Sequence, residues 1–174
     1  MIKTWFSRED KTAGQDAETQ AGVSSSLPSP ASLADEASHT MVFGGGCFWC
    51  TEAVFLAVRG VRSVESGYSG GSLSHPDYDA ICTGTSGHAE VVRVHFDPAQ
   101  VDLKTLYQIF FATHDPTTLN RQGHDVGTQY RSVILTLSEQ QERIAKALVS
   151  ELEASKIFAS AIVTQIVPLE RFWI

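Results

Sequence analysis

The segment from Met41 to Glu52 constrains the fold more than any other part of this 174-residue chain. A short apolar run is followed by three consecutive glycines, Gly44–Gly46, and then by Cys47. From Cys47 onward, cysteine and apolar positions recur at steps of three and four residues, which is the spacing of one helix face. The segment is therefore predicted to run from a strand through a glycine turn into a helix, with Cys47 in the first helical turn.

Cys47 is a candidate nucleophile because of this position. The start of a helix offers free N–H groups and the positive end of the helix dipole, and both favour a negatively charged thiolate. The thiolate is the reactive form of cysteine, and the glycines let the backbone come close to a substrate. The alternative is a buried cysteine in a tight turn before a core helix, but a glycine-flanked Cys-x-x-Cys at a helix start favours the reactive thiol.

Charge and cysteine content limit the class of protein. The chain has 13 Lys and Arg against 20 Asp and Glu, and this net charge of −7 argues against a nucleic-acid-binding or membrane-surface protein. Three cysteines are too few for a disulfide scaffold and suit a cytoplasmic protein with a redox or catalytic thiol. No apolar run reaches the roughly 18 residues that a membrane-spanning helix needs, and no signal peptide follows Met1.

The composition divides the chain into two parts. Residues 1–38 are predicted to be a disordered polar N-terminal tail, because a segment rich in Thr, Gly, Gln, Ala, Ser and Pro cannot bury enough apolar surface to fold. Residues 39–174 are expected to form a single catalytic domain. The chain ends on the apolar residues Phe172–Ile174, whereas termini are normally polar and loose. We therefore expect this domain to be truncated at its C-terminus.

Hydrophobic periodicity predicts the remaining elements. Strands are expected at 41–43, 61–68, 89–96, 130–137 and 161–167, and helices from Cys47 to a stop at Gly60, at 102–113 and at 138–156. A long polar loop, residues 114–129, is expected to be functional or disordered. Helices interleaved with strands, some of them joined by tight turns, predict an α+β fold, a two-layer α/β sandwich with a mixed sheet of the ferredoxin-like kind.

A thiol that reduces an electrophilic centre needs a proton donor, and Glu90 is the candidate. It lies at the start of a strongly apolar strand, where burial would raise its pKa and keep it protonated at neutral pH. The alternative is an exposed glutamate at a strand end. Tyr78 and Tyr130 are candidate hydrogen-bond donors, although each alone is more simply interpreted as a packed tyrosine. Asp125, in the long loop, is a weaker candidate.

The residues next to Cys47 are candidates for substrate binding. Phe48 and Trp49 would form an apolar wall of a pocket, or they would simply fill the core. No metal site is expected, because one Cys-x-x-Cys and scattered histidines lack the second pair of ligands that zinc sites have. The glycines do not have the spacing of a dinucleotide-binding motif.

A second thiol is needed to regenerate Cys47. Cys50 lies one helical turn later on the same face, and a disulfide across such a turn is feasible, as redox Cys-x-x-Cys motifs show. Cys82 is flanked by Ile81 and small residues, and we interpret it as a buried structural cysteine. Cys50 is therefore the predicted recycling residue.

Four motifs occur in a characteristic order along the chain, at Gly45–Trp49, Gly67–Gly71, Gly87–Glu90 and Gly123–Ser132. Together they resemble the motifs of peptide methionine sulfoxide reductases of the A type. The resemblance runs from about Met41 to Ile174, and Gly-Cys-Phe-Trp followed by Gly-His-Ala-Glu is highly specific. It implies the same ferredoxin-like sandwich and an enzyme that reduces the S epimer of methionine sulfoxide, free or in proteins, and so repairs proteins after oxidative stress.

The resemblance also gives each candidate residue a role. It implies that Cys47 attacks the sulfoxide sulfur and that Glu90 protonates the oxide oxygen. It further implies that Tyr78 and Tyr130 hold that oxygen and that Asp125 positions the sulfoxide. Phe48 and Trp49 would form the wall for the substrate methyl group. Cys47 is then left as a sulfenic acid, a disulfide forms, and thioredoxin or another dithiol reduces it. A monomer without metal or cofactor is expected.

Two departures from the family's pattern leave alternatives open. Many members have glycine where this chain has Cys50, and they carry recycling cysteines in a C-terminal tail that this chain lacks. Members also continue past Trp173 with an acidic, aromatic and histidine-containing segment. The alternative functions are a thioredoxin-like disulfide oxidoreductase, for which the Cys-x-x-Cys would suffice, and an inactive fragment that only binds sulfoxide peptides.

Overall fold

The computed structural model describes residues 36, 38–73, 81 and 85–174. Two residues with predicted roles, Tyr78 and Cys82, lie outside the described residues, as does nearly all of the predicted tail.

Six strands form one mixed sheet in the spatial order β7-β6-β1-β3-β2-β8. Their bounds are β1 Thr40–Gly44, β2 Val61–Ser69, β3 Ala89–Phe96, β6 Val133–Thr136, β7 Gln165–Pro168 and β8 Phe172–Trp173. Neighbouring strands are antiparallel except β6 and β7, which are parallel. The central strands β6-β1-β3-β2, with a helix after β1 and another after β3, have the ferredoxin-like connectivity. The predicted α+β fold with a mixed sheet is confirmed.

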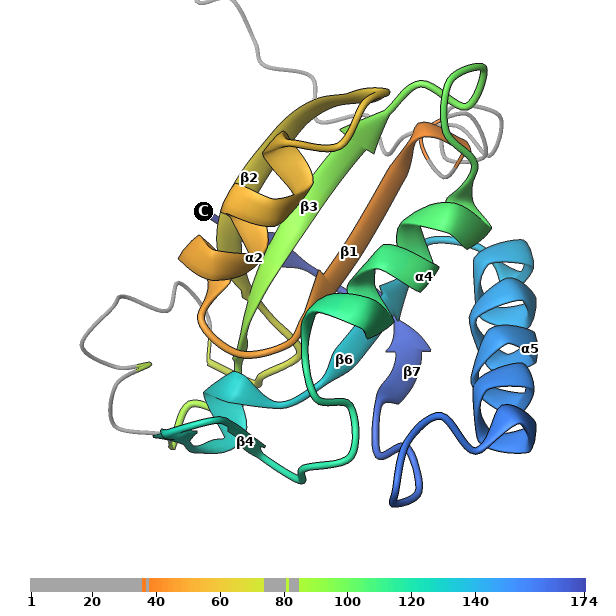
Figure 1. The fold of residues 1–174 in the computed structure, drawn as a ribbon. Helices are drawn as coiled ribbons and strands as arrows, with labels where there is room; N and C mark the ends of the chain where they lie inside the picture. The colour runs from red at the N-terminus through yellow and green to blue at the C-terminus, as the bar shows by residue number, and fades with distance from the viewer. Residues whose placement is uncertain (1–35, 37, 74–80, 82–84) are drawn as a thin grey trace, which may run out of the picture.

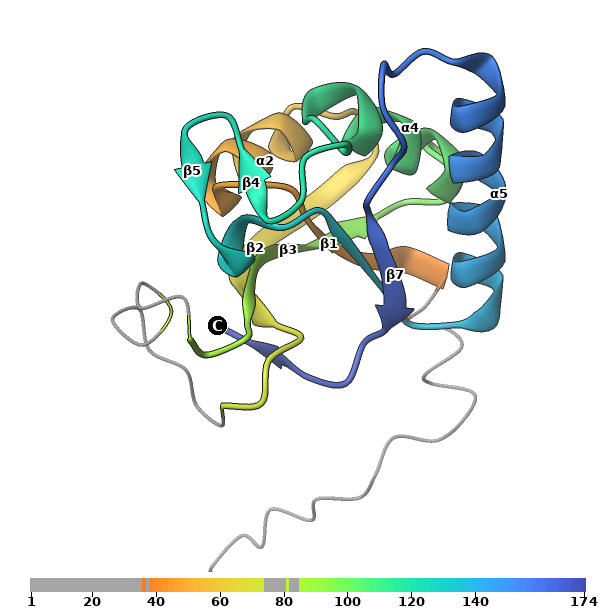
Figure 2. The ribbon, with the colours of Figure 1, turned by 90° about the horizontal axis from the view of Figure 1, so that it is seen from below.

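The helices form a second layer. Helices α2 (Phe48–Leu56) and α4 (Leu103–Thr113) cover one face of the sheet, and α5 (Glu139–Ser155) lies beside α4 near β6 and β7 (Figure 1). Seen from below, the C-terminal segment crosses the opposite side of the sheet toward β2 (Figure 2). The predicted helix starts are also confirmed, because Asp102 accepts a hydrogen bond from the Thr105 N–H and Ser138 accepts one from the Gln141 N–H.

Aromatic side chains hold the two layers together. The ring of Phe43 on β1 lies 4.6 Å from that of Phe55 on α2 and 4.8 Å from that of Phe110 on α4, measured between centroids. All three side chains are fully buried. This contact fixes α2, and therefore the residues at its start, against the strand that precedes it.

Both faces of the central strands are buried, because successive side chains of a strand point to opposite faces. In β1, Met41 and Phe43 join the core under the helices, whereas Val42 joins a smaller cluster on the other face. That smaller cluster consists of Val42, Ala89, Val91, Val133 and Leu135, with Leu137, Leu169 and Phe172 packed against it. The C-terminal segment therefore covers the face that the helices leave open.

The C-terminal segment contains a strand that the sequence patterns did not predict. In β8, Trp173 pairs with Tyr68 and Phe172 pairs with Ser69, and the hydroxyl of Ser69 donates a hydrogen bond to the backbone oxygen of Arg171. The apolar residues near the chain end therefore extend the sheet. Two residues are too few to show the alternation by which strands are recognised.

Some predicted boundaries were wrong, mainly around the long loop. The strand predicted from Tyr130 begins at Val133, because Thr128–Tyr130 forms a 3₁₀ turn, η1. The strand predicted from Ala161 begins at Gln165. The loop itself contains a short hairpin of β4 (Arg121–Gln122) and β5 (Asp125–Val126).

Phe172 is expected to stabilise the C-terminal segment on the sheet. Its ring belongs to the smaller cluster and lies 4.5 Å below the guanidinium carbon of Arg93. Phe172→Ala should lower the free energy of unfolding by about 1–3 kcal/mol, which is less than for a fully buried phenylalanine. Ile174→Ala is the control, because Ile174 is 85% exposed and should change stability by about 0.5 kcal/mol or less. Urea unfolding measures both, and equal effects of the two substitutions would contradict this prediction.

Candidate active site

The glycine turn brings the start of α2 close to β3. A Cβ added at Gly44 would lie 2.3 Å from the backbone oxygen of Glu90, so only glycine permits this approach. Gly46 has φ +98°, a conformation that residues with a side chain rarely adopt. Cys47 then forms the N-cap of α2, one position before the first turn, and its backbone oxygen accepts hydrogen bonds from the N–H groups of Cys50 and Thr51.

Cys47 and Cys50 face the same small cavity. Cys47 is half-buried, Cys50 is exposed, and both are free thiols. The cavity has a volume of about 150 Å³ and is lined by Gly45, Cys47, Cys50, Thr51, Val54, Phe110, Thr113, His114, Gln122 and Asp125. The two thiols therefore share one side of α2, as the spacing predicted.

The pKa of Cys50 is raised, and the cause with the largest effect is the negative charge of Cys47. Burial, a side-chain hydrogen bond with Cys47 and the charge of Asp125 raise it further. Cys50 therefore holds its proton more tightly than an ordinary cysteine does.

Glu90 lies in β3 directly below the start of α2. Its side chain is only 6% exposed, and its Oε2 accepts a hydrogen bond of 3.0 Å from the backbone N–H of Phe48. Burial is the main cause that raises its pKa, the charge of Asp125 adds to this, and the bond from Phe48 opposes it. The alternative of an exposed strand-end glutamate is wrong. A buried carboxyl whose pKa is raised above its ordinary value is suited to proton donation.

The aromatic residues next to Cys47 occupy different environments. Phe48 is buried, whereas Trp49 is 63% exposed, and their ring centroids lie 5.6 Å apart. The ring of Phe48 also lies 5.5 Å from that of Tyr68, which pairs with Glu90 between β2 and β3. Sequence reasoning gave Tyr68 no role in the site, although it lies in the Gly67–Gly71 motif, because its position at the end of a strand did not show what its ring would contact. Together these rings form an aromatic cluster at the start of α2.

Asp125 and Tyr130 come from the segment between α4 and β6. Asp125 is exposed on β5, lines the cavity of the two cysteines, and raises the pKa of both Glu90 and Cys50. Tyr130 is half-buried at the end of η1, which contacts β3. Tyr78 lies outside the described residues. The structure thus brings Asp125 to Cys47 and Glu90 across many residues of sequence.

Two further residues of this segment, which sequence reasoning interpreted only as loop residues, pack on the glycine turn. The side chain of Gln122 lies against Gly46, and its amide exchanges two hydrogen bonds with the backbone of Asp115. His114 is half-buried and lies against Gly45. The length of the polar loop was the available signal, but it did not show which side chains turn inward.

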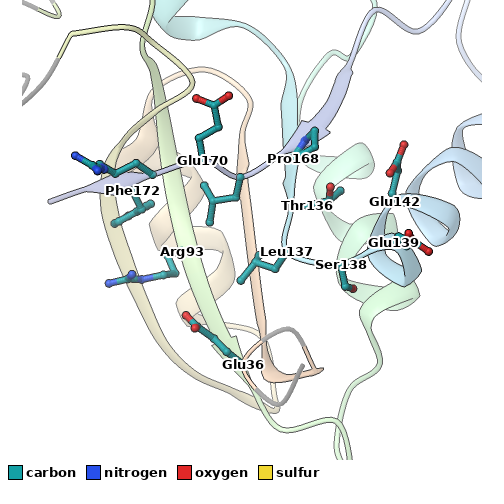
Figure 3. Close-up of a pocket in the computed structure, with 12 residues that line it drawn as sticks. Glu36, Arg93, Thr136, Leu137, Ser138, Glu139, Glu142, Pro168, Glu170 and Phe172 are labelled. Atoms are coloured by element: carbon teal, nitrogen blue, oxygen red, sulfur yellow. The ribbon is translucent and has the colours of Figure 1, made fainter. Parts of the chain in front are cut away.

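A larger cavity, of about 560 Å³, lies elsewhere in the molecule. It is lined by Glu36, Arg93, Thr136, Leu137, Ser138, Glu139, Glu142, Pro168, Leu169, Glu170, Arg171 and Phe172. Figure 3 shows Arg93 and Phe172 on one side of it and the start of α5, with Glu139 and Glu142, on the other. None of the predicted site residues lines this cavity, so the chemistry of the cysteines belongs to the smaller one.

Within residues 36, 38–73, 81 and 85–174, no group of three or more His, Cys, Asp or Glu side chains could hold a metal ion. None of the helices in this part of the chain is long and apolar enough to cross a membrane.

Comparison with known proteins agrees with the geometry of the site. The family model for peptide methionine sulfoxide reductase matches residues 39–174. The peptide methionine sulfoxide reductase MsrA of Trichodesmium erythraeum is 55% identical over 134 residues, which is 77% of this chain and 76% of the relative. That of Saccharolobus solfataricus is 53% identical over 130 residues, which is 75% of this chain and 72% of the relative.

Solved structures show the same fold. Methionine sulfoxide reductase A of Corynebacterium diphtheriae superimposes with a TM-score of 0.68 at 34% identity, over 78% of this chain and 69% of that one. Reduced Mxr1 of Saccharomyces cerevisiae superimposes with a TM-score of 0.72 at 32% identity, over 76% of this chain and 77% of that one. The fold and the cysteine pair at the helix start define a thiol-dependent oxidoreductase. The chain belongs to the peptide methionine sulfoxide reductase family, A type.

The raised pKa of Glu90 predicts how its substitution changes stability with pH. The folded state binds the proton of Glu90 more tightly than the unfolded state does. The free energy of unfolding therefore falls as the pH rises from the ordinary glutamate pKa, about 4.3, through the raised pKa. Glu90→Gln removes this loss and still accepts the Phe48 N–H. The stability of the variant relative to the parent, measured by urea unfolding, should therefore increase as the pH rises from about 4.3 through the raised pKa of Glu90. A difference that is constant with pH would contradict the raised pKa.

Proposed function

We propose that this chain reduces the S epimer of methionine sulfoxide, free or in proteins, to methionine through Cys47. The observation that carries the proposal is the hydrogen bond from the Phe48 N–H to Glu90, because it holds a buried carboxylic acid at the start of the helix that presents the thiol. Family membership supports the reaction, and the site supplies the two groups that the reaction needs. Each electron comes from a thiol, so the mechanism requires no metal or prosthetic group.

The first step uses the opposite protonation states of Cys47 and Glu90. The Cys47 thiolate attacks the sulfoxide sulfur while Glu90 donates its proton to the oxide oxygen. The oxygen is then transferred as a hydroxyl group to the sulfur of Cys47: its bond to the substrate sulfur and the transient sulfur–sulfur bond break, and a sulfur–oxygen bond to Cys47 forms. The sulfide leaves as methionine, and Cys47 is left as a sulfenic acid. The substrate is reduced by two electrons, and the cysteine is oxidised by two.

Substrate binding is assigned to the residues around these two groups. Phe48 and Trp49 form the wall for the substrate methyl group, and the exposed position of Trp49 would allow it to contact a peptide. Tyr78 and Tyr130 hold the oxide oxygen. Asp125 positions the sulfoxide, and its charge also helps to keep Glu90 protonated.

Recycling is assigned to Cys50. Its thiol condenses with the Cys47 sulfenic acid, which forms a disulfide and releases water. Cys50 lines the same cavity as Cys47 and is exposed, so an external dithiol can reach its sulfur in the disulfide. Cys47 then leaves as a thiolate, which the helix start stabilises. We assign thioredoxin as this dithiol and the reducing cytoplasm as the compartment.

The catalytic domain is assigned to residues 39–174. The family model matches the same residues, which supports this boundary. Residues 1–38 are assigned to the polar tail, which we expect to contribute no catalytic group.

The stereochemistry of the substrate tests the proposed reaction. The proposed donors for the oxide oxygen and the proposed aromatic wall for the methyl group allow oxygen and methyl to be placed in only one way. The chain should therefore consume pure S-sulfoxide and leave pure R-sulfoxide, as measured by methionine formation with thioredoxin or dithiothreitol. Insulin disulfide reduction without sulfoxide turnover would instead indicate a thioredoxin-like oxidoreductase.

Glu90→Gln is the matched control for that experiment. The amide accepts the same hydrogen bond but cannot deliver a proton, so S-sulfoxide reduction should slow by about 10²–10⁴-fold. Parental rates in this variant would show that Glu90 is not the proton donor.

Substitution of the two other cysteines tests recycling. Cys50→Ser should form about one equivalent of methionine per enzyme and then stop, because no thiol condenses with the sulfenic acid. It should not turn over with thioredoxin, while a small dithiol would partly restore turnover. Cys82→Ser is the control and should turn over normally. If Cys82→Ser stalls and Cys50→Ser does not, the recycling assignment is wrong.

A further inference from the structure

His114 is a half-buried titratable side chain that the proposed mechanism does not use. It is the C-cap residue of α4, and its ring stacks on that of Phe110 at a centroid distance of 4.1 Å. Its Nδ1 lies 2.7 Å from the backbone oxygen of Phe110, and its Nε2 lies 2.7 Å from Oγ of Ser132. Oγ of Ser132 lies 2.7 Å from Oγ1 of Thr164. These contacts join the end of α4 to the residues that precede β6 and β7.

The chemistry of these partners determines which atoms carry protons. A backbone carbonyl only accepts, so Nδ1 of His114 carries the proton. Burial lowers the pKa of His114, although the hydrogen bond to Phe110 and the charge of Asp115 act in the opposite direction. The ring is therefore neutral at neutral pH. Nε2 then accepts the hydroxyl proton of Ser132, and Ser132 accepts that of Thr164. The hydrogen bonds form one directed chain from Thr164 to the Phe110 carbonyl.

The carbon edge of the same ring lies against the glycine turn. A Cβ added at Gly45 would lie 2.9 Å from both Cγ and Cδ2 of His114 and 3.0 Å from Cε2 of Phe110. Gly45 has no positive φ, so the neighbouring rings and not the backbone conformation exclude a side chain there. Gly45, Cys47 and His114 line the same cavity. The ring therefore forms the surface on which the turn rests, two residues before the thiol.

We propose that His114 is a positioning residue for Cys47: the hydrogen-bonded imidazole holds Gly45, and Gly45 sets the thiol at the start of α2. The reactivity of Cys47 depends on its position relative to the helix N–H groups and to Glu90. A displacement of about 1 Å in such an arrangement can slow a reaction by about 10²-fold. The inference deepens the proposed function and rests on it for the identity of the reaction.

His114 is not a general base in this arrangement. Both ring nitrogens are engaged, one by the Phe110 carbonyl and the other by Ser132, so neither is available to take a proton from Cys47 or Cys50. Its effect on the thiol passes through the backbone of the turn. A positioning role therefore predicts that substitutions of His114 and of Gly45 have interdependent effects on the reactivity of Cys47.

The test uses the full chain with Cys50→Ser and Cys82→Ser, so that Cys47 is the single thiol. Two quantities are measured in folded protein: the rate of the first methionine equivalent, and the pH midpoint of Cys47 alkylation by iodoacetamide. His114→Asn keeps a donor for the Phe110 carbonyl but removes the ring surface and the link to Ser132. It should slow the first turnover by about 10–100-fold and raise the alkylation midpoint, because the thiolate is less well placed at the helix start.

A double-mutant cycle separates positioning from a general loss of stability. Gly45→Ala alone should slow the reaction, because its methyl group pushes the turn away from the ring. The double variant Gly45→Ala with His114→Asn should lose less activity than the product of the fold-losses of the two single variants. The asparagine is smaller than the imidazole ring and leaves room for the methyl group of the alanine. Gly44→Ala is the control, because its added methyl group clashes with the backbone of Glu90 and not with His114. The fold-loss of Gly44→Ala combined with His114→Asn should equal the product of the two single fold-losses.

An unchanged alkylation midpoint in His114→Asn, or simple multiplication of effects in both cycles, would overturn the inference. A parent chain that reduces no sulfoxide would contradict the proposed function. The alkylation midpoints and their coupling to Gly45 would still decide the role of His114.

Discussion

The hydrogen bond between the Phe48 N–H and the Glu90 carboxyl connects the two halves of the site. It joins the first turn of α2 to β3, and it forms because Gly44 lets β1 lie against the backbone of Glu90 without a side chain between them. The N–H involved is one of those that a helix start leaves without an internal partner. The buried carboxyl thereby accepts a hydrogen bond from this free N–H group of α2, and the same bond holds the carboxyl beside the thiol.

This arrangement places groups with opposite requirements within one small volume. The proposed mechanism needs Cys47 as a thiolate, whereas it needs Glu90 and Cys50 in their protonated forms. Burial raises the pKa of Glu90, and the charge of Cys47 raises that of Cys50. Asp125 adds to both shifts from across the cavity. Under the proposed mechanism, environments that push the pKa values of neighbouring groups apart allow a nucleophile, an acid and a recycling thiol to work at one pH.

The sheet gives this site a rigid base because both of its faces are covered. The aromatic contacts of Phe43 fix α2 and α4 on one face, and the C-terminal segment with Phe172 covers the other. The end of α4 then presents His114 to the glycine turn. The position of Cys47 thus depends on the sheet, on the helices that cover one of its faces and on the C-terminal segment that covers the other.

The sequence by itself determined the strand, glycine turn and helix around Cys47, the ferredoxin-like order of elements, and the position of Cys47 and Cys50 on one side of the helix. Periodicity and short spacings are local properties of a chain. Only the tertiary structure decided that β8 exists, that Tyr68 lies against Phe48, that Asp125 reaches the cysteines, and that His114 turns inward. Each of these depends on segments far apart in sequence that meet through the packing of the sheet. A two-residue strand or a single histidine in a polar loop has no periodicity from which such a meeting could be predicted.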